Sequence, residues 1–204
     1  MSAFEFFFSF YGLVLGLSVA VIATGLATAI QHRRKIRIGW LTPLLALFVG
    51  LDIASFWDSA WNVFRDAPFN YGMLVAGMAI ALVYFIAASL VFPHEITDGL
   101  ALDDHFWANK KVVLLLTTAA NALMIALSAT HMLATPEGLI TLISMLALLT
   151  LYALLVIPAA VTESRKVFAG LVGLHVVIYL LSAAASPFAT APGHPASPPS
   201  SAAT

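Results

Sequence analysis

Asp52 is the residue with the clearest potential for chemistry, because it is an acid inside the apolar stretch 39–61. Counted from Trp40, it lies about 18 Å along a helix that rises 1.5 Å per residue, close to the middle of a bilayer. An acid at that depth costs about 2.5–3.5 kcal/mol on insertion scales, so it normally faces the bundle interior or a water-filled cavity. We therefore predict that Asp52 binds or relays a cation or a proton.

A stripe of polar residues follows Asp52 on the same predicted helix. Ser55, Ser59 and Asn62 lie three, seven and ten residues further on, which places them on one helical face, and Asp58 lies near the outer end of that face. Such a lane suits a vestibule for an ion or a solute. The same residues could instead make hydrogen bonds between helices, with Asp52 protonated and static. Both interpretations stay open at this point.

Two further polar residues are expected at a depth similar to that of Asp52. Asn121 lies about 15 Å from Lys111 along its segment, and His175 lies about 12 Å from Val167 along its own. An acid, an amide and an imidazole at one level could form a proton relay or a coupling site. A fixed hydrogen-bonded plug that sets helix registry is the alternative, since adjacency of the helices cannot be read from these spacings.

Metal and haem sites are not expected. Six possible ligands cluster in the third connection, namely His94, Glu95, Asp98, Asp103, Asp104 and His105. They are weak surface candidates for a divalent cation, because their spacing matches no defined loop such as the EF-hand. A solvated loop is favoured, with Asp98 capping a short interfacial helix that packs Phe106 and Trp107 on the membrane. His131 and His175 differ too much in depth to ligate one haem, so no cofactor is predicted.

Composition places the chain in the membrane class. Of its 204 residues, 61% are hydrophobic and 9% are charged, whereas soluble domains carry about 25% charged residues. The absence of cysteine excludes disulfides, thiolate metal sites and cysteine nucleophiles. The chain contains no Walker loop, nucleophile elbow, HExxH or dinucleotide motif, so an enzyme is not favoured. The lipid bilayer is the predicted partner, and nucleic acid is not.

Six apolar segments are long enough to cross a bilayer, and a single apolar run in lipid can only be a helix. We therefore predict an all-α bundle of six transmembrane helices. The predicted spans are 8–30, 39–61, 70–92, 111–134, 138–160 and 167–187. The remaining segment, 188–204, is rich in Pro, Ser and Ala and is predicted to be disordered.

The distribution of basic residues predicts the orientation of the bundle. Four lie in the first connection, two in the third, two in the fifth and one in the second. By the positive-inside rule, the odd-numbered connections are cytoplasmic and both termini face the other side, as in a bacterial-type inner membrane. The N-terminal residues lack the basic region of a signal peptide, so the first apolar segment is interpreted as a retained span.

Two classes of function are favoured by these observations, and an intramembrane enzyme is a third, less favoured choice. The first is a small transporter or channel-like protein that uses Asp52. The second is a membrane sensor, an assembly factor or a subunit of a larger membrane complex, with a homo-oligomer or another membrane protein as partner. A GxxxG pair, Gly12 and Gly16, would allow another helix to approach closely, and packing within the bundle is favoured over a homodimer seam.

Overall fold

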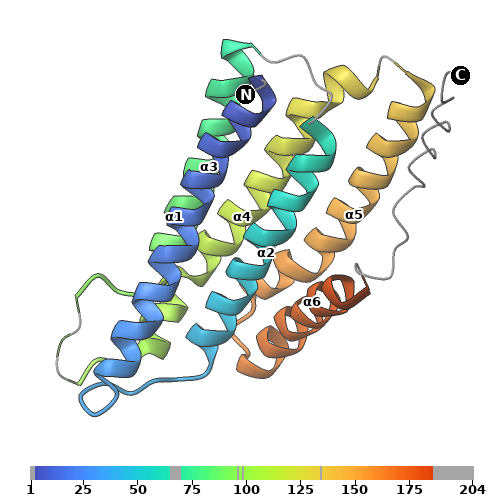
Figure 1. The fold of residues 1–204 in the computed structure, drawn as a ribbon. Helices are drawn as coiled ribbons and strands as arrows, with labels where there is room; N and C mark the ends of the chain where they lie inside the picture. Colours follow the sequence, from blue (N-terminus) through green and yellow to red (C-terminus); the bar gives the residue numbers. More distant parts are fainter. Residues whose placement is uncertain (1–2, 65–69, 96, 98, 134, 186–204) are drawn as a thin grey trace, which may run out of the picture.

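The computed structural model describes residues 3–64, 70–95, 97, 99–133 and 135–185. Within these ranges the chain folds into six helices (Figure 1), whose bounds are α1 (Ala3–Gln31), α2 (Leu41–Phe64), α3 (Tyr71–Ser89), α4 (Leu102–Met132), α5 (Pro136–Val161) and α6 (Arg165–Ala185). Each is long and apolar enough to cross a membrane. The six-helix prediction is confirmed, and the chain is a multi-pass membrane protein. The predicted cap at Asp98 and the tail 188–204 lie outside the described residues.

The main difference from the predicted spans is at the start of α4. This helix begins at Leu102, well before the predicted residue 111, and its first turns replace the expected loop and interfacial helix. The reason is packing: Leu102 and Phe106 are buried, and the Phe106 ring meets the Phe168 ring edge-on at 4.7 Å between centroids. Phe106 therefore belongs to the core, and the expectation that it packs on the membrane is wrong.

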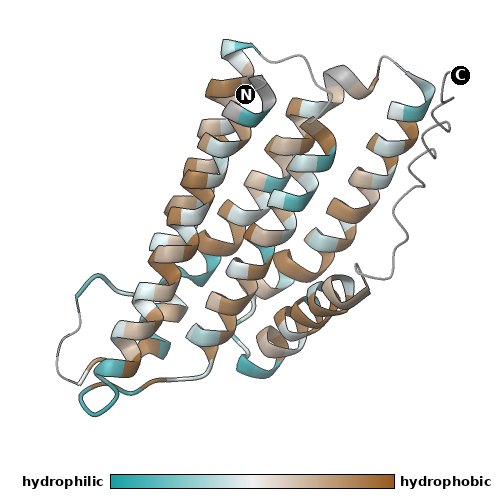
Figure 2. Ribbon diagram, in the orientation of Figure 1, coloured by the Kyte–Doolittle hydropathy of each residue, from teal (hydrophilic) through white to brown (hydrophobic). Residues whose placement is uncertain are grey.

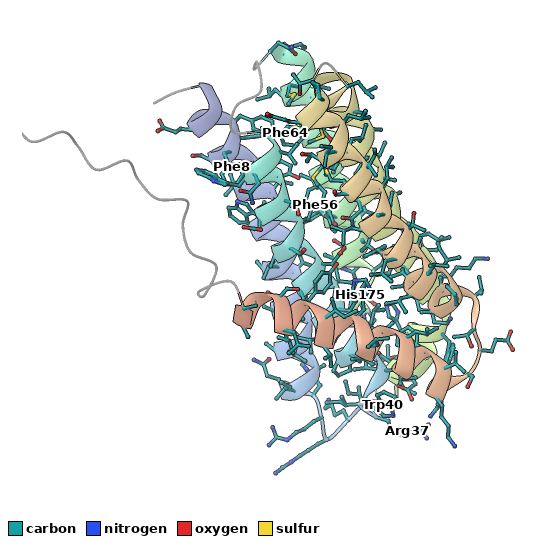
Figure 3. All side chains as sticks on the ribbon, turned by 90° about the vertical axis from the view of Figure 1, so that its right-hand side faces the viewer. Phe8, Arg37, Trp40, Phe56, Phe64 and His175 are labelled. Atoms are coloured by element: carbon teal, nitrogen blue, oxygen red, sulfur yellow. The ribbon has the colours of Figure 1, made fainter. Side chains whose placement is uncertain are left out.

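Helix α2 is the centre of the bundle. It contacts α1, α3, α4 and α6, while α1 pairs with α3 and α4 pairs with α5. Helix α6 crosses the others obliquely and covers part of α2 and α5 (Figures 1 and 3). The backbones of α2 and α5 stay apart along their described residues, and the two helices meet only through side chains such as Phe48 and Tyr152, whose ring centroids are 6.2 Å apart. Half of the most apolar part of α2 is buried, more than in any other of the six described helices, which is consistent with its central position.

The first, third and fifth connections meet at one end of the bundle. The Arg37 N–H donates to the Leu100 carbonyl at 3.0 Å, and the Leu102 N–H donates to the Arg37 carbonyl at 3.2 Å. Arg165 at the start of α6 forms an ion pair with Asp103 at 3.4 Å. Hydrophilic residues gather at the ends of the bundle while apolar residues cover its length (Figure 2). The basic connections therefore share one end, as expected, and its identity as the cytoplasmic side stays a prediction.

The small-residue pair in α1 is divided between two environments. A Cβ atom at Gly12 would lie 2.6 Å from the Trp57 ring, so α1 and α2 approach closely there. At Gly16 a Cβ atom would have no neighbour within 4 Å. Gly12 thus serves packing within the bundle, whereas Gly16 makes no close contact with the described residues.

Lys110 fastens α4 to the end of α5. Its buried Nζ donates hydrogen bonds to the carbonyls of Ala159, Ala160 and Thr162 at 3.0, 2.9 and 2.7 Å. Helices end with carbonyls that have no helical donor, and a cation there also meets the negative end of the helix dipole. Lys110 is therefore a structural residue in addition to contributing to the charge of this end.

Substitution of Lys110 by Met should lower the free energy of unfolding by about 2–4 kcal/mol, because two buried carbonyls and one half-buried carbonyl lose a charged donor. The measurement is denaturant-induced unfolding in detergent micelles, with the exposed neighbour Lys111→Met as the matched control. Equal stability of the two variants would contradict the role assigned to Lys110.

The predicted orientation can be checked because the chain contains no cysteine. We expect a membrane-impermeant maleimide to label Glu137→Cys in intact cells and Ser164→Cys only after permeabilisation. Both positions are exposed and lie at opposite ends of α5. The reverse pattern would show that the basic end is not cytoplasmic, and the cysteine-free parent protein sets the background.

Candidate intramembrane binding site

The Asp52 carboxylate is the acceptor for hydrogen bonds from three other helices. Its side chain is 1% exposed. Tyr179 of α6 donates to Oδ1 at 2.6 Å, and Tyr84 of α3 donates to Oδ2 at 3.0 Å. The Asn121 amide of α4 lies at 3.4 and 3.5 Å from the two oxygens. Burial favours the neutral acid and donated hydrogen bonds favour the ion, so Asp52 experiences two opposing influences.

Helical periodicity places Asp52 in the interior. Three buried residues share the face of α2 that carries Asp52. They are Phe48 and Val49, four and three residues before it, and Phe56, four residues after it. The Phe56 ring lies 4.7 Å from the Tyr84 ring, which supports the tyrosine beside the carboxylate. The apolar face of α2 therefore carries the acid into the bundle and supplies the packing that holds one of its donors.

The polar cluster extends from Asp52 to α5. Besides Asp52, the Asn121 amide nitrogen lies 3.0 Å from both the Tyr84 hydroxyl and the Thr117 carbonyl. Because an amide has two N–H groups, these contacts compete for its donors. The Tyr152 hydroxyl of α5 donates to the Thr117 hydroxyl at 3.0 Å. Side chains of α2 to α6 thus meet around one acid.

His175 lies beside this cluster without a hydrogen bond to Asp52. The imidazole is 6% exposed and is bordered by the rings of Tyr179 at 4.7 Å, Tyr152 at 4.9 Å and Phe48 at 5.4 Å. It lies on the side of α6 that faces the bundle (Figure 3). Its Nδ1 atom is buried and has no hydrogen-bond partner among the described residues. Of the three residues expected at one depth, Asp52 and Asn121 are in contact and His175 is separated from them by aromatic rings.

A cavity of about 280 Å³ adjoins the cluster between α2, α4, α5 and α6. Asn121, Tyr152, Tyr179 and His175 form its polar floor. The remaining polar residues of the wall are Ser55, Ser59 and Ser182, and the rest of the wall is apolar. Asp52 does not itself line the cavity, but its hydrogen-bond partners Asn121 and Tyr179 do.

The polar stripe predicted on α2 reaches the cavity only in part, since Asn62 is exposed and donates to the Asp58 carbonyl of its own helix at 2.9 Å. Ser55 and Ser59 line the cavity. Asp58 is exposed and borders a separate hollow with Phe8 and Trp57. The structure therefore brings the two serines toward the Asp52 cluster and leaves Asp58 outside it.

The surface candidates for a metal have other roles in the structure. Asp103 pairs with Arg165, and the His105 Nε2 atom lies 3.0 Å from the Leu90 carbonyl. His94, Glu95 and Asp104 are exposed. Among the described residues no three His, Asp or Glu side chains gather as a metal site would require.

The three tyrosines of the cluster were missed by the sequence analysis. Tyr84, Tyr152 and Tyr179 each lie well inside an apolar span, more than ten residues after the start of their helices. Membrane tyrosines concentrate at the bilayer interfaces, so a tyrosine at depth is itself a signal of a polar partner. That signal was available and would have indicated the donors of Asp52.

Comparison with known proteins adds no functional information: no protein family model, no curated protein and no solved structure matches this chain.

Replacement of Tyr179 by Phe should lower the free energy of unfolding by about 1–3 kcal/mol, because a buried carboxylate oxygen loses its shortest hydrogen bond. Unfolding in mixed micelles measures the loss. Tyr71→Phe is the control, since that side chain is 81% exposed. In combination with Asp52→Asn, the cost of Tyr179→Phe should shrink; purely additive costs would contradict a direct interaction.

Proposed function

We propose that this chain is a small membrane transporter in which Asp52 takes up and releases a proton beside a cavity open on one side. The observation that carries the proposal is the placement of Asp52, the sole buried acid among the described residues. Intramembrane acids are costly and usually mark transport pathways or proton relays. Here the acid adjoins a cavity with a polar floor, as a coupling site would require.

The chemistry around Asp52 favours a proton over a metal cation. Its neighbours present two hydroxyl groups and an amide N–H, all of which donate to the carboxylate. A hard cation such as Ca²⁺ is usually held by several carboxylate and carbonyl oxygens, whereas this cluster supplies a single carboxylate. Hydroxyl groups can both donate and accept, so a proton leaving Asp52 would find a hydrogen-bonded path toward the cavity.

The packing between Asp52 and the basic end of the bundle favours a carrier over an open channel. Toward the basic end of the bundle, Phe48 and Leu45 of α2, Leu114 of α4 and Phe168 of α6 are at most 1% exposed. These side chains form an apolar barrier between the cluster and that end. A site closed toward one end of the bundle is what one state of an alternating-access carrier presents.

The charge distribution supports an orientation for this carrier. Ser55 and Ser59 lie beyond Asp52 in the direction away from the basic connections. With those connections in the cytoplasm, the cavity belongs to the non-cytoplasmic half of a bacterial-type inner membrane.

A second candidate is a sensor, an assembly factor or a subunit of a larger membrane complex. It is supported by the three protein donors around Asp52, which would suit a static hydrogen-bonded cluster that fixes the relative positions of the helices. In that case the partner would be another membrane protein or a second copy of this chain.

The deciding experiment is flux into liposomes that contain purified protein and an internal pH-sensitive dye. Under an imposed gradient, Asp52→Asn should lower the proton flux at least about tenfold, because an amide does not exchange a proton at neutral pH. Glu137→Gln removes an exposed acid at the end of α5 and should leave the flux unchanged. Absence of flux for protons, sodium and potassium in the parent protein would favour the second candidate.

A further inference from the structure

We infer that the cavity between α2, α4, α5 and α6 binds a small uncharged amphiphile, with an apolar body and a hydroxyl or carbonyl group, which enters sideways from the lipid. The inference deepens the proposed function by naming the class of molecule that the Asp52 site serves. Binding itself can be measured independently of transport.

The cavity wall favours an uncharged ligand. Its apolar part comes from leucine, isoleucine and methionine side chains of α4, α5 and α6, and its polar part consists of hydroxyls, one amide and one imidazole. No Asp, Glu, Lys or Arg lines it. A charged ligand would lose its hydration without gaining a counter-ion, at a large cost in free energy. The volume of about 280 Å³ lies just below the usual range of ligand pockets and limits the ligand to a small molecule.

The polar groups of the wall are available to a ligand. In much of the bundle, hydroxyls within helices donate to the carbonyl four residues earlier, as Ser144 and Thr150 of α5 do at 2.9 and 2.8 Å. Within the described part of the chain, Ser55, Ser59 and Ser182 donate to no protein group, and all three line the cavity.

The imidazole of His175 is a further polar group of the cavity wall. Its ring lines the cavity and is 6% exposed, whereas its Nδ1 atom is buried away from the cavity and has no partner among the described residues. A ligand bearing a hydroxyl or carbonyl group would supply partners for the three serines of the wall.

The route into the cavity runs through the lipid-facing side of the bundle. The backbones of α2 and α5 stay apart along their described residues, and α6 crosses both helices obliquely (Figure 3). On the α5 side the rim consists of Leu148 and Leu151, which are 67% and 50% exposed. In a bilayer these side chains meet lipid tails, so an apolar molecule would reach the cavity without crossing water.

The floor of the cavity links a ligand to Asp52. Asn121 and Tyr179 line the cavity and also contact the Asp52 carboxylate. A ligand group that accepts a hydrogen bond from either residue competes with Asp52 for that donor. Occupancy of the cavity and the protonation of Asp52 are therefore coupled, which is what proton-linked transport of such a molecule requires.

The test uses the full-length protein in phosphatidylcholine nanodiscs and decanol carrying a diazirine as a photoreactive probe. We expect saturable labelling of peptides from α4, α5 and α6, displaced by decanol and not by decane or decanoate. Met145→Trp should abolish this labelling by filling the cavity. Ser55→Ala combined with Ser59→Ala should raise the half-saturating concentration at least about fivefold, the factor for one lost hydrogen bond. Ser144→Ala, with its hydroxyl bonded to its own helix, should match the parent protein.

Three outcomes would overturn the inference. Labelling that does not saturate and persists in Met145→Trp would show contact with the lipid-facing surface alone. Equal displacement by decanoate would remove the requirement for an uncharged ligand. Absence of labelling would show a cavity that holds only water. Saturable labelling without proton flux in the presence of decanol would retain the binding site and reject the transporter, whereas flux without labelling would do the reverse.

Discussion

A carboxylic acid in an apolar interior has to be hydrogen-bonded, and this requirement at Asp52 organises the bundle. The donors come from Tyr84, Asn121 and Tyr179, on three different helices. Because lipid provides little drive for helices to associate, such hydrogen bonds and close packing decide which helices are neighbours. The hydrogen bonds to Asp52 thus help to hold α3, α4 and α6 against the central helix α2.

The two ends of the molecule are held differently. At the basic end, the first and third connections pair through their backbones, Asp103 meets Arg165, and Lys110 caps α5. Toward the other end the backbones of α2 and α5 are apart, and the cavity lies between α2, α4, α5 and α6. The contacts between connections therefore lie at one end of the bundle and the cavity toward the other.

The elements predicted well are those that a single segment determines. Each of the six apolar runs forms a helix. The number of residues from the end of each helix placed Asp52 and Asn121 at a similar depth in the bilayer, and their side chains are in contact in the structure. The start of α4 was predicted too late because Asp103 and Asp104 were assigned to a loop. In the structure these acids occupy the first turn of a helix, where they meet the positive end of its dipole, and Phe106 on the other face enters the core.

The sequence by itself determined the membrane class, the number of helices and the burial of an acid, since hydropathy and helical rise are properties of one continuous segment. Tertiary structure alone decided which side chains meet that acid and where the cavity opens. Tyr179 and Asp52 are separated by 127 positions, and their contact depends on how α6 crosses α2. Packing of this kind depends on the interlocking of whole helix surfaces, which no local pattern specifies.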